Sequence, residues 1–167
     1  SPFKLPLRNG VVELPSDPFE GLAGVFNDSL PDGWGRLLFD RMMRSKGISP
    51  SEVSTLDRLA YVGLNGMGAL VYEPDSSPPI NQEFIDLDHL ATQTEKILEG
   101  ASGEVITELL ALNGSSAGAR PKALIGVDQA RKNISYGVNQ LNDGFEHWLV
   151  KFPNSQDGID SGAIEYV

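Results

Sequence analysis

A dense run of small residues, NGSSAGARPK, occupies residues 113–122 and leads into the apolar run ALIGVD. A loop of small residues between a helix and a strand can point successive backbone N–H groups at a phosphate. Lys151 follows in the apolar stretch HWLVKFP, and Glu165 lies fourteen residues further on. Protein kinases pair a strand lysine with a helix glutamate and with nucleotide phosphates. The spacing therefore raises phosphoryl transfer as one chemistry for this chain.

Other interpretations of the small-residue run stay open. Gly114 and Gly118 are too close together for a Walker A motif, and no Gly-Lys-Ser/Thr follows them. The segment does fit G-x-S-x-G with Ser116 in the middle, but a nucleophile elbow needs a preceding strand, and a helix is predicted here. A serine hydrolase is therefore weakly supported. An ordinary surface loop that begins where a helix stops, at Asn113-Gly114, is the structural alternative to phosphate binding.

Charge is distributed unevenly along the chain. The net charge is −10 and the pI is near 4.5, which argues against a surface that binds duplex nucleic acid along its whole length. From Leu59 to Ala119 there is one basic residue, Lys96, against nine acidic ones. Four basic residues then follow within thirteen positions, namely Arg120, Lys122, Arg131 and Lys132. The small-residue run thus lies where an acidic segment meets a locally basic one.

Composition excludes several other classes. The chain has 167 residues, of which 40% are hydrophobic and 22% are charged, as in a folded globular protein. It has no cysteine, so disulfides, zinc–cysteine sites and thiol catalysis are excluded. His89 and His147 belong to no metal-ligand pattern. No membrane-length apolar run and no signal peptide is present. The first residue is not Met and SGAIEYV reads as the start of a helix, so we expect a fragment of a longer protein.

Periodicity predicts an α+β fold. Leu56, Leu59 and Ala60 should form one face of a helix with a Ser54–Asp57 cap. In the last strand, alternation predicts His147, Leu149 and Lys151 on one face and Trp148, Val150 and Phe152 on the other. The predicted helices cover residues 32–46, 51–63, 86–100 and 102–114, and the predicted strands cover 69–73, 122–128 and 145–153, with a strand or turn at 135–144.

Four motifs, in this order along the chain, resemble the HipA-like serine/threonine kinases, the toxins of bacterial HipBA toxin–antitoxin modules. They are FNDSLPDGWGRLLFDRMM, LDRLAYVGLNGMGAL, GSSAGARPKALI and WLVKFP. The resemblance implies an amino-terminal HipA subdomain over residues 1–76, incomplete at its start, and a linker over 77–82. Residues 83–167 would begin a kinase-like domain, with the start of its amino-terminal lobe.

The resemblance also implies roles for individual residues. The stretch from Asn113 to Lys122 would be the glycine-rich loop over the ATP phosphates. Lys151 would hold the α- and β-phosphates, and Glu165 would orient Lys151 through an ion pair. The serine that such kinases autophosphorylate would be Ser115, with Ser116 as the alternative. Contacts to ATP would come from Ser115, Ser116, Ala117, Gly118 and Ala119 in the loop, together with Lys151 and Glu165.

The remaining implications concern what lies outside this chain. The catalytic Asp and Asn and the Asp that holds Mg²⁺ are expected beyond residue 167, so no catalytic or metal-binding residue is assigned here, and this part should be inactive alone. The implied partners are a HipB-like helix-turn-helix antitoxin, DNA only through that antitoxin, and a protein substrate such as an aminoacyl-tRNA synthetase. The implied location is the cytoplasm, with no membrane partner. The alternative is a non-catalytic interaction module that binds a DNA-binding antitoxin or the kinase body.

Overall fold

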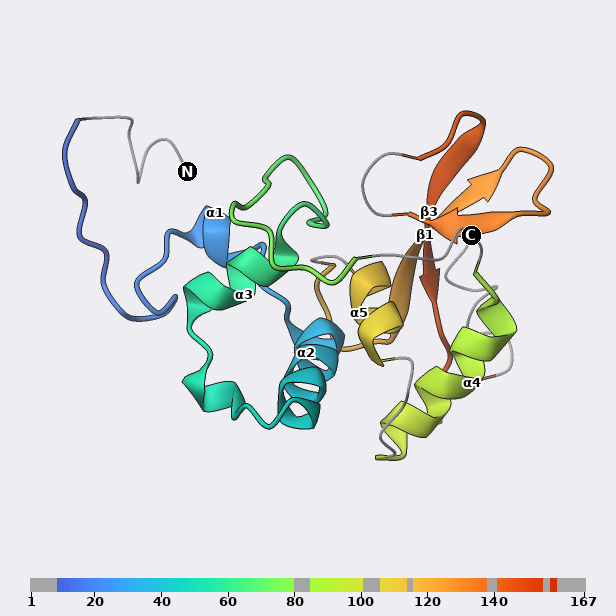
Figure 1. Cartoon of the computed structure of the whole chain (residues 1–167), viewed down its shortest axis with the longest axis horizontal. Coiled ribbons are helices and arrows are strands. Elements are labelled where there is room, and N and C mark those ends of the chain that lie inside the picture. The colour runs from blue at the N-terminus through green and yellow to red at the C-terminus, as the bar shows by residue number, and fades with distance from the viewer. Residues whose placement is uncertain are drawn as a thin grey trace.

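The computed structural model describes residues 9–79, 85–100, 106–113, 116–137, 141–154 and 157–158. Within these ranges lie five α-helices, one short 3-10 helix and three β-strands. Figure 1 shows the first three α-helices grouped on one side and the sheet with α4 on the other, with α5 between α2 and the sheet. The mixture of helices and a small antiparallel sheet agrees with the predicted α+β class.

Helix α2 (Gly33–Ser45) is the main helix of the amino-terminal half, after the short α1 (Gly24–Asn27). The apolar residues of α2 recur at helical spacing, and the side chains of Trp34, Leu38 and Met42 are buried. The predicted helix over 32–46 is therefore confirmed within one residue at each end.

Helix α3 (Thr55–Val62) follows a 3-10 turn, η1 (Pro50–Glu52), so the predicted helix over 51–63 is in fact two elements. The predicted cap is confirmed, because the Ser54 hydroxyl accepts a hydrogen bond from the Asp57 amide at 3.2 Å. The predicted inner face is wrong in one residue, since Leu56 is 67% exposed. With the helix beginning only at Thr55, Leu56 lies in its first turn and points outward, while Leu59 and Val62 are buried.

We predict that Ser54→Ala lowers the free energy of unfolding by about 1 kcal/mol, because it removes an N-cap. The Ser54 hydroxyl and the Ser54 backbone amide both donate hydrogen bonds to the Asp57 carboxylate. These bonds, the first more than the second, hold the pKa of Asp57 below its ordinary value of 3.8. A carboxyl group whose pKa is lower in the folded state stabilises the fold at pH values above its ordinary pKa. This stabilisation is lost as the pH falls. Denaturant unfolding should therefore show the largest deficit near neutral pH, with Ser54→Thr close to wild type.

The predicted strand over 69–73 is wrong. These residues form irregular backbone, and the Tyr72 amide donates to the Gly63 carbonyl oxygen at 3.0 Å, just after α3. A strand needs a neighbouring strand to complete its hydrogen bonds, and this segment runs beside the end of a helix instead. Val71, in the middle of the segment, is 61% exposed.

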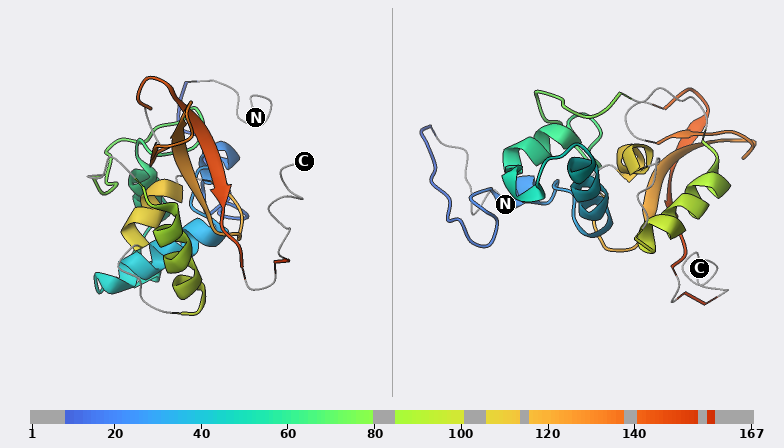
Figure 2. Two further views of the ribbon diagram at one scale, coloured as in Figure 1. Left: turned by 90° about the vertical axis from the view of Figure 1, so that its right-hand side faces the viewer. Right: turned by 60° about the horizontal axis from the view of Figure 1, so that its bottom comes forward.

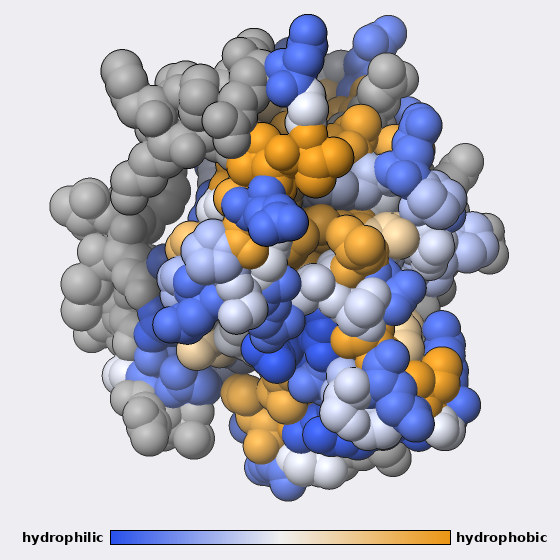
Figure 3. Space-filling model, turned by 90° about the vertical axis from the view of Figure 1, so that its left-hand side faces the viewer, coloured by the Kyte–Doolittle hydropathy of each residue, from blue (hydrophilic) through white to orange (hydrophobic). Residues whose placement is uncertain are grey.

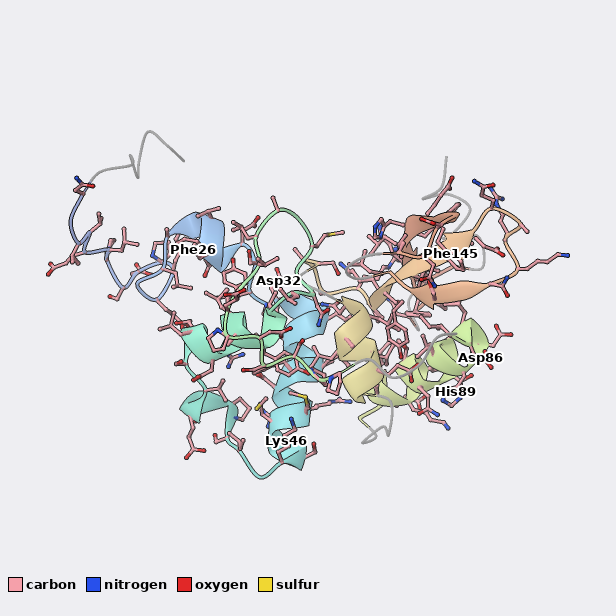
Figure 4. All side chains as sticks on the ribbon, turned by 45° about the horizontal axis from the view of Figure 1, so that its top comes forward. Phe26, Asp32, Lys46, Asp86, His89 and Phe145 are labelled. Carbon is pink, nitrogen blue, oxygen red and sulfur yellow. The ribbon has the colours of Figure 1, made fainter. Side chains whose placement is uncertain are left out.

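Helices α4 (Leu87–Leu98) and α5 (Ile106–Asn113) lie within the predicted ranges 86–100 and 102–114. Asp86, labelled in Figure 4, caps α4 by accepting hydrogen bonds from the Asp88 and His89 amides. The two views in Figure 2 show α4 and α5 alongside the sheet. From α5, the Glu108 carboxylate accepts a hydrogen bond from the Tyr136 hydroxyl at 3.1 Å, and burial with this neighbour raises the pKa of Tyr136.

The sheet has the order β2-β1-β3, and both pairings are antiparallel. Its strands are β1 (Lys122–Asp128), β2 (Ile134–Tyr136) and β3 (Phe145–Lys151), so the predicted strands over 122–128 and 145–153 are confirmed. The predicted alternation in β3 also holds, because Trp148 and Val150 pack on the core while Leu149 is 43% exposed.

A single cluster of buried residues connects the two halves of the described chain. It takes Trp34 and Phe39 from α2, Leu90 from α4, Leu112 from α5 and Ile125 from β1. Helix α5 contacts both α2 and β1, so it is the element through which the amino-terminal helices reach the sheet. The loop between α5 and β1 is thereby fixed at the junction of the two halves.

Candidate functional site

The loop that leaves α5 and enters β1 contains the predicted phosphate-binding residues. Its first described residue, Ser116, is 3% exposed, and its hydroxyl donates to the Asn113 carbonyl oxygen at 2.8 Å. Asn113, the last residue of α5, is itself fully buried. The Ser116 hydroxyl is thus engaged at the end of α5, while Ala117, Gly118 and Ala119 are exposed.

The amino-terminal end of α2 holds Gly118. Asp32, which is labelled in Figure 4, marks this end of the helix. The Gly118 amide donates to Asp32 Oδ1 at 2.7 Å, and the Gly118 carbonyl oxygen accepts from the Trp34 amide at 3.0 Å. First-turn amides of a helix lack an acceptor within the helix, so the loop carbonyl satisfies one of them. We call this pair of hydrogen bonds the Asp32–Trp34 grip on Gly118.

Two glycines of α2 make this close approach possible. A Cβ on Gly33 would lie 2.5 Å from the carbonyl carbon and oxygen of Gly118, and Gly33 has a φ of +44°. A Cβ on Gly35 would lie 2.4 Å from the Asn113 side-chain nitrogen. A side chain at Gly33 would thus collide with loop backbone, which cannot rotate away as a flexible side chain can.

Two lysines lie opposite each other at the end of the β1–β3 strand pair, where the loop enters the sheet. Lys122 of β1 pairs directly with Lys151 of β3, and directly paired residues in an antiparallel sheet project to the same face. Lys122 is buried and its Nζ donates to the Ala117 carbonyl oxygen, whereas Lys151 is exposed. The strand register therefore places two basic residues next to the loop, at the end of the β1–β3 strand pair.

The far side of the loop is tied to the segment after β3. The Phe152 amide donates to the Pro121 carbonyl oxygen at 2.9 Å, and Arg120 forms an ion pair with Asp157. A hydrogen bond from the Asn154 amide, together with Arg120, lowers the pKa of Asp157. The loop is fixed on both sides by backbone and charged contacts.

Some predicted site residues cannot be placed. Ser115 and Glu165 lie outside the described residues, so the predicted Lys151–Glu165 ion pair and the position of the Ser115 hydroxyl stay predictions. The structure does bring Ser116, Ala117, Gly118 and Ala119 into one loop next to the strand pair that carries Lys151.

Sequence reasoning missed two residues that the structure places at the loop. Asp32 was considered only as the start of a helix, and Lys122 only as a local positive charge at the end of the predicted loop. The signal for the first was available in PDGWG, because two glycines in the first turn of a helix indicate a close backbone neighbour. The partner of Lys122 depends on strand register, which sequence alone left open.

The described residues contain no group of three or more His, Asp or Glu side chains that could hold a metal ion. His147 is instead engaged with the chain, its Nδ1 lying 2.8 Å from the Gly137 carbonyl oxygen. None of the helices in the described ranges is long and apolar enough to cross a membrane.

Comparison with known families identifies the amino-terminal part. The family model for the HipA N-terminal domain matches residues 1–73. This match supports a HipA-like amino-terminal fragment, in agreement with the resemblance predicted from the sequence. The matched residues include Asp32 and Trp34, so the grip on Gly118 comes from the part of the chain that is similar to the HipA N-terminal domain. No curated protein and no solved structure matches the chain.

Proposed function

We propose that this chain is the amino-terminal part of an ATP-dependent serine/threonine protein kinase of the HipA toxin family, with residues 113–122 as its phosphate-binding loop. The observation that carries the proposal is the grip of Asp32 and Trp34 on Gly118. This contact joins the part of the chain that is similar to the HipA N-terminal domain to the loop that the resemblance assigns to the ATP phosphates. In this proposal residues 83–167 begin a kinase-like amino-terminal lobe.

Small side chains and nearby positive charge are what the loop offers to a nucleotide triphosphate, while its Gly118 amide is already donated to Asp32. Ala117, Gly118 and Ala119 are exposed and carry side chains too small to block a phosphate. Lys122 and Lys151 supply positive charge on one face at the edge of the sheet. Phosphoryl transfer depends mainly on positioning and charge neutralisation, and these are the two contributions that this part of the chain offers. The catalytic Asp and Asn, and the carboxylate for Mg²⁺, would come from residues beyond Val167.

The burial of Ser116 favours Ser115 as the autophosphorylated residue. The Ser116 hydroxyl is 2.8 Å from the Asn113 carbonyl oxygen, and the residue is 3% exposed. Phosphorylating it would break this contact and force a group with a charge of roughly −1.5 to −2 into the junction of α5 and the loop. Modification of Ser115 would add the same charge beside the nucleotide phosphates and repel them, which would switch the site off.

The test of this function is autophosphorylation by the full-length protein. After incubation with ATP and Mg²⁺, mass spectrometry should find one added phosphate on the peptide that spans residues 113–122. Ser115→Ala should abolish this modification and Ser116→Ala should retain it, since only the second hydroxyl is committed to Asn113. Phosphate retained in Ser115→Ala would move the assignment to Ser116, and an unmodified wild-type protein would contradict the proposed activity.

The remaining parts of the proposal concern location and partners. We infer a cytoplasmic protein that pairs with a HipB-like helix-turn-helix antitoxin, contacts DNA only through that partner, and phosphorylates a protein such as an aminoacyl-tRNA synthetase. These parts rest on the HipA family relation of residues 1–73.

A second candidate function is a non-catalytic module that binds the DNA-binding antitoxin or the kinase body. It is favoured by apolar side chains on the surface of the HipA N-terminal domain. Figure 3 shows apolar surface gathered on the side of the molecule that this domain forms, and its exposed apolar residues include Val25, Phe26, Leu64, Met67 and Val71. Co-purification of the chain with the neighbouring helix-turn-helix protein at micromolar concentration would support this function, and its absence would count against it.

A further inference from the structure

We propose that Asp32 is a positioning residue for the phosphate-binding loop, through which the HipA N-terminal domain sets the affinity for ATP without touching the nucleotide. This inference rests on the proposed function, because it assigns a role to a residue outside the nucleotide site. It starts from a contact between two residues 86 positions apart in the sequence.

The Asp32 carboxylate is committed to the loop and not to its own helix. Asp32 occupies the N-cap position of α2, where a carboxylate usually accepts amides of the first helical turn. It makes no such bond, and its Oδ1 accepts from the Gly118 amide at 2.7 Å instead. Hydrogen bonds to an ionised acceptor are stronger than those between neutral groups. The Asp32 side chain therefore binds the loop and does not cap its own helix.

The grip fixes both peptide units of Gly118. The amide is held by Asp32, and the carbonyl oxygen is held by the Trp34 amide at 3.0 Å. Gly118 has a φ of +106°, a conformation that a glycine adopts without strain and that other residues rarely adopt. Since glycine has no side chain to pack, these two backbone bonds hold the exposed apex of the loop in one conformation.

A fixed loop binds nucleotide more tightly than a loop that must first be ordered. Binding to a mobile loop loses the free energy spent on ordering it, and a preorganised loop avoids that loss. Loss of one charge-assisted hydrogen bond at Gly118 should therefore raise KM for ATP roughly tenfold. The turnover number should change less, because Lys122 and Lys151 stay in place on their strands.

Asp32 also permits a clean experiment, because the fold does not depend on its side chain. The residue is exposed, whereas α2 is anchored by buried side chains such as Trp34 and Leu38. Asp32→Ala removes the acceptor, and Asp32→Asn keeps an oxygen acceptor of the same shape while removing the charge. Asp28→Ala is the matched control, because it removes an exposed carboxylate four residues earlier.

The experiment measures two quantities on the full-length protein and each variant: hydrogen–deuterium exchange of the peptide that contains Gly118, and KM and kcat for ATP in autophosphorylation. We expect Asp32→Ala to exchange faster at this peptide and to raise KM roughly tenfold. Asp32→Asn should recover most of both properties, and Asp28→Ala should match wild type.

Two outcomes separate this inference from the proposed function. If ATP binds and KM in Asp32→Ala equals that of wild type, the positioning role is wrong while the nucleotide site stands. If wild type does not bind ATP at all, the proposed function fails, and the positioning role fails with it. A fall in kcat with KM unchanged would also overturn the inference, because a loop that orders the phosphates acts on binding.

Discussion

Replacing Lys151 with alanine in the full-length protein should lower the rate of autophosphorylation by roughly 100-fold or more. Lys151 lies at the end of β3, beside the loop and directly opposite Lys122. In the proposed site its ammonium group holds the α- and β-phosphates, and phosphoryl transfer depends mainly on positioning the nucleotide and neutralising its charge. The rate of phosphate incorporation from labelled ATP measures the effect.

Lys132→Ala is the control for this experiment. Lys132 is also exposed and belongs to the same half of the chain, but it lies in the turn between β1 and β2, away from the β1–β3 edge where Lys151 lies. Its loss should leave the rate unchanged. If Lys151→Ala incorporates phosphate as fast as wild type, the proposed role of Lys151 is wrong. If both lysine variants lose activity equally, the effect reflects general charge and not a site.

Replacing Trp34 with alanine should destabilise the protein by about 3–5 kcal/mol, the cost of removing a large aromatic side chain from a packed core. Trp34 is 1% exposed and belongs to the cluster that joins α2, α5 and the sheet. Domains of this size are stable by only about 5–15 kcal/mol, so the loss is a large fraction of the total. Denaturant unfolding followed by circular dichroism measures it.

Leu56→Ala is the matched comparison, because it truncates an apolar side chain of the same amino-terminal half that is 67% exposed. Its free energy of unfolding should lie within about 0.5 kcal/mol of wild type. Equal losses in the two variants would contradict the packing described for α2. The Trp34 side chain is separate from the backbone amide that binds Gly118, so this prediction concerns the core alone.

Local patterns in the sequence predicted much of the fold. The apolar spacing of α2 and α4, the Ser54–Asp57 cap and the alternation in β3 all depend on residues within a few positions of one another. The predicted strand over 69–73 failed because its composition favours a strand while its surroundings offer no strand to pair with. Leu56 was misplaced because the buried face of α3 runs through Arg58, Leu59 and Val62, and Leu56 lies away from that face.

The candidate site was less predictable, because its contacts join distant residues. The bond between Asp32 and Gly118 spans 86 positions, and nothing local to either residue identifies the other. The pairing of Lys122 with Lys151 depends on strand register, and a shift by one residue would move one lysine to the opposite face. The glycines of PDGWG are a local signal of a close backbone neighbour that was overlooked, and only the fold identifies this neighbour as Gly118.

Nucleotide binding at the loop is the central claim, and hydrogen–deuterium exchange of the full-length protein with and without ATP and Mg²⁺ tests it most directly. We predict that ATP slows amide exchange in the peptide that spans residues 113–122, and that Lys151→Ala weakens this protection. Protection by ATP at other peptides with no change in this one, or no binding at millimolar ATP, would contradict the assignment of the loop as a phosphate-binding site.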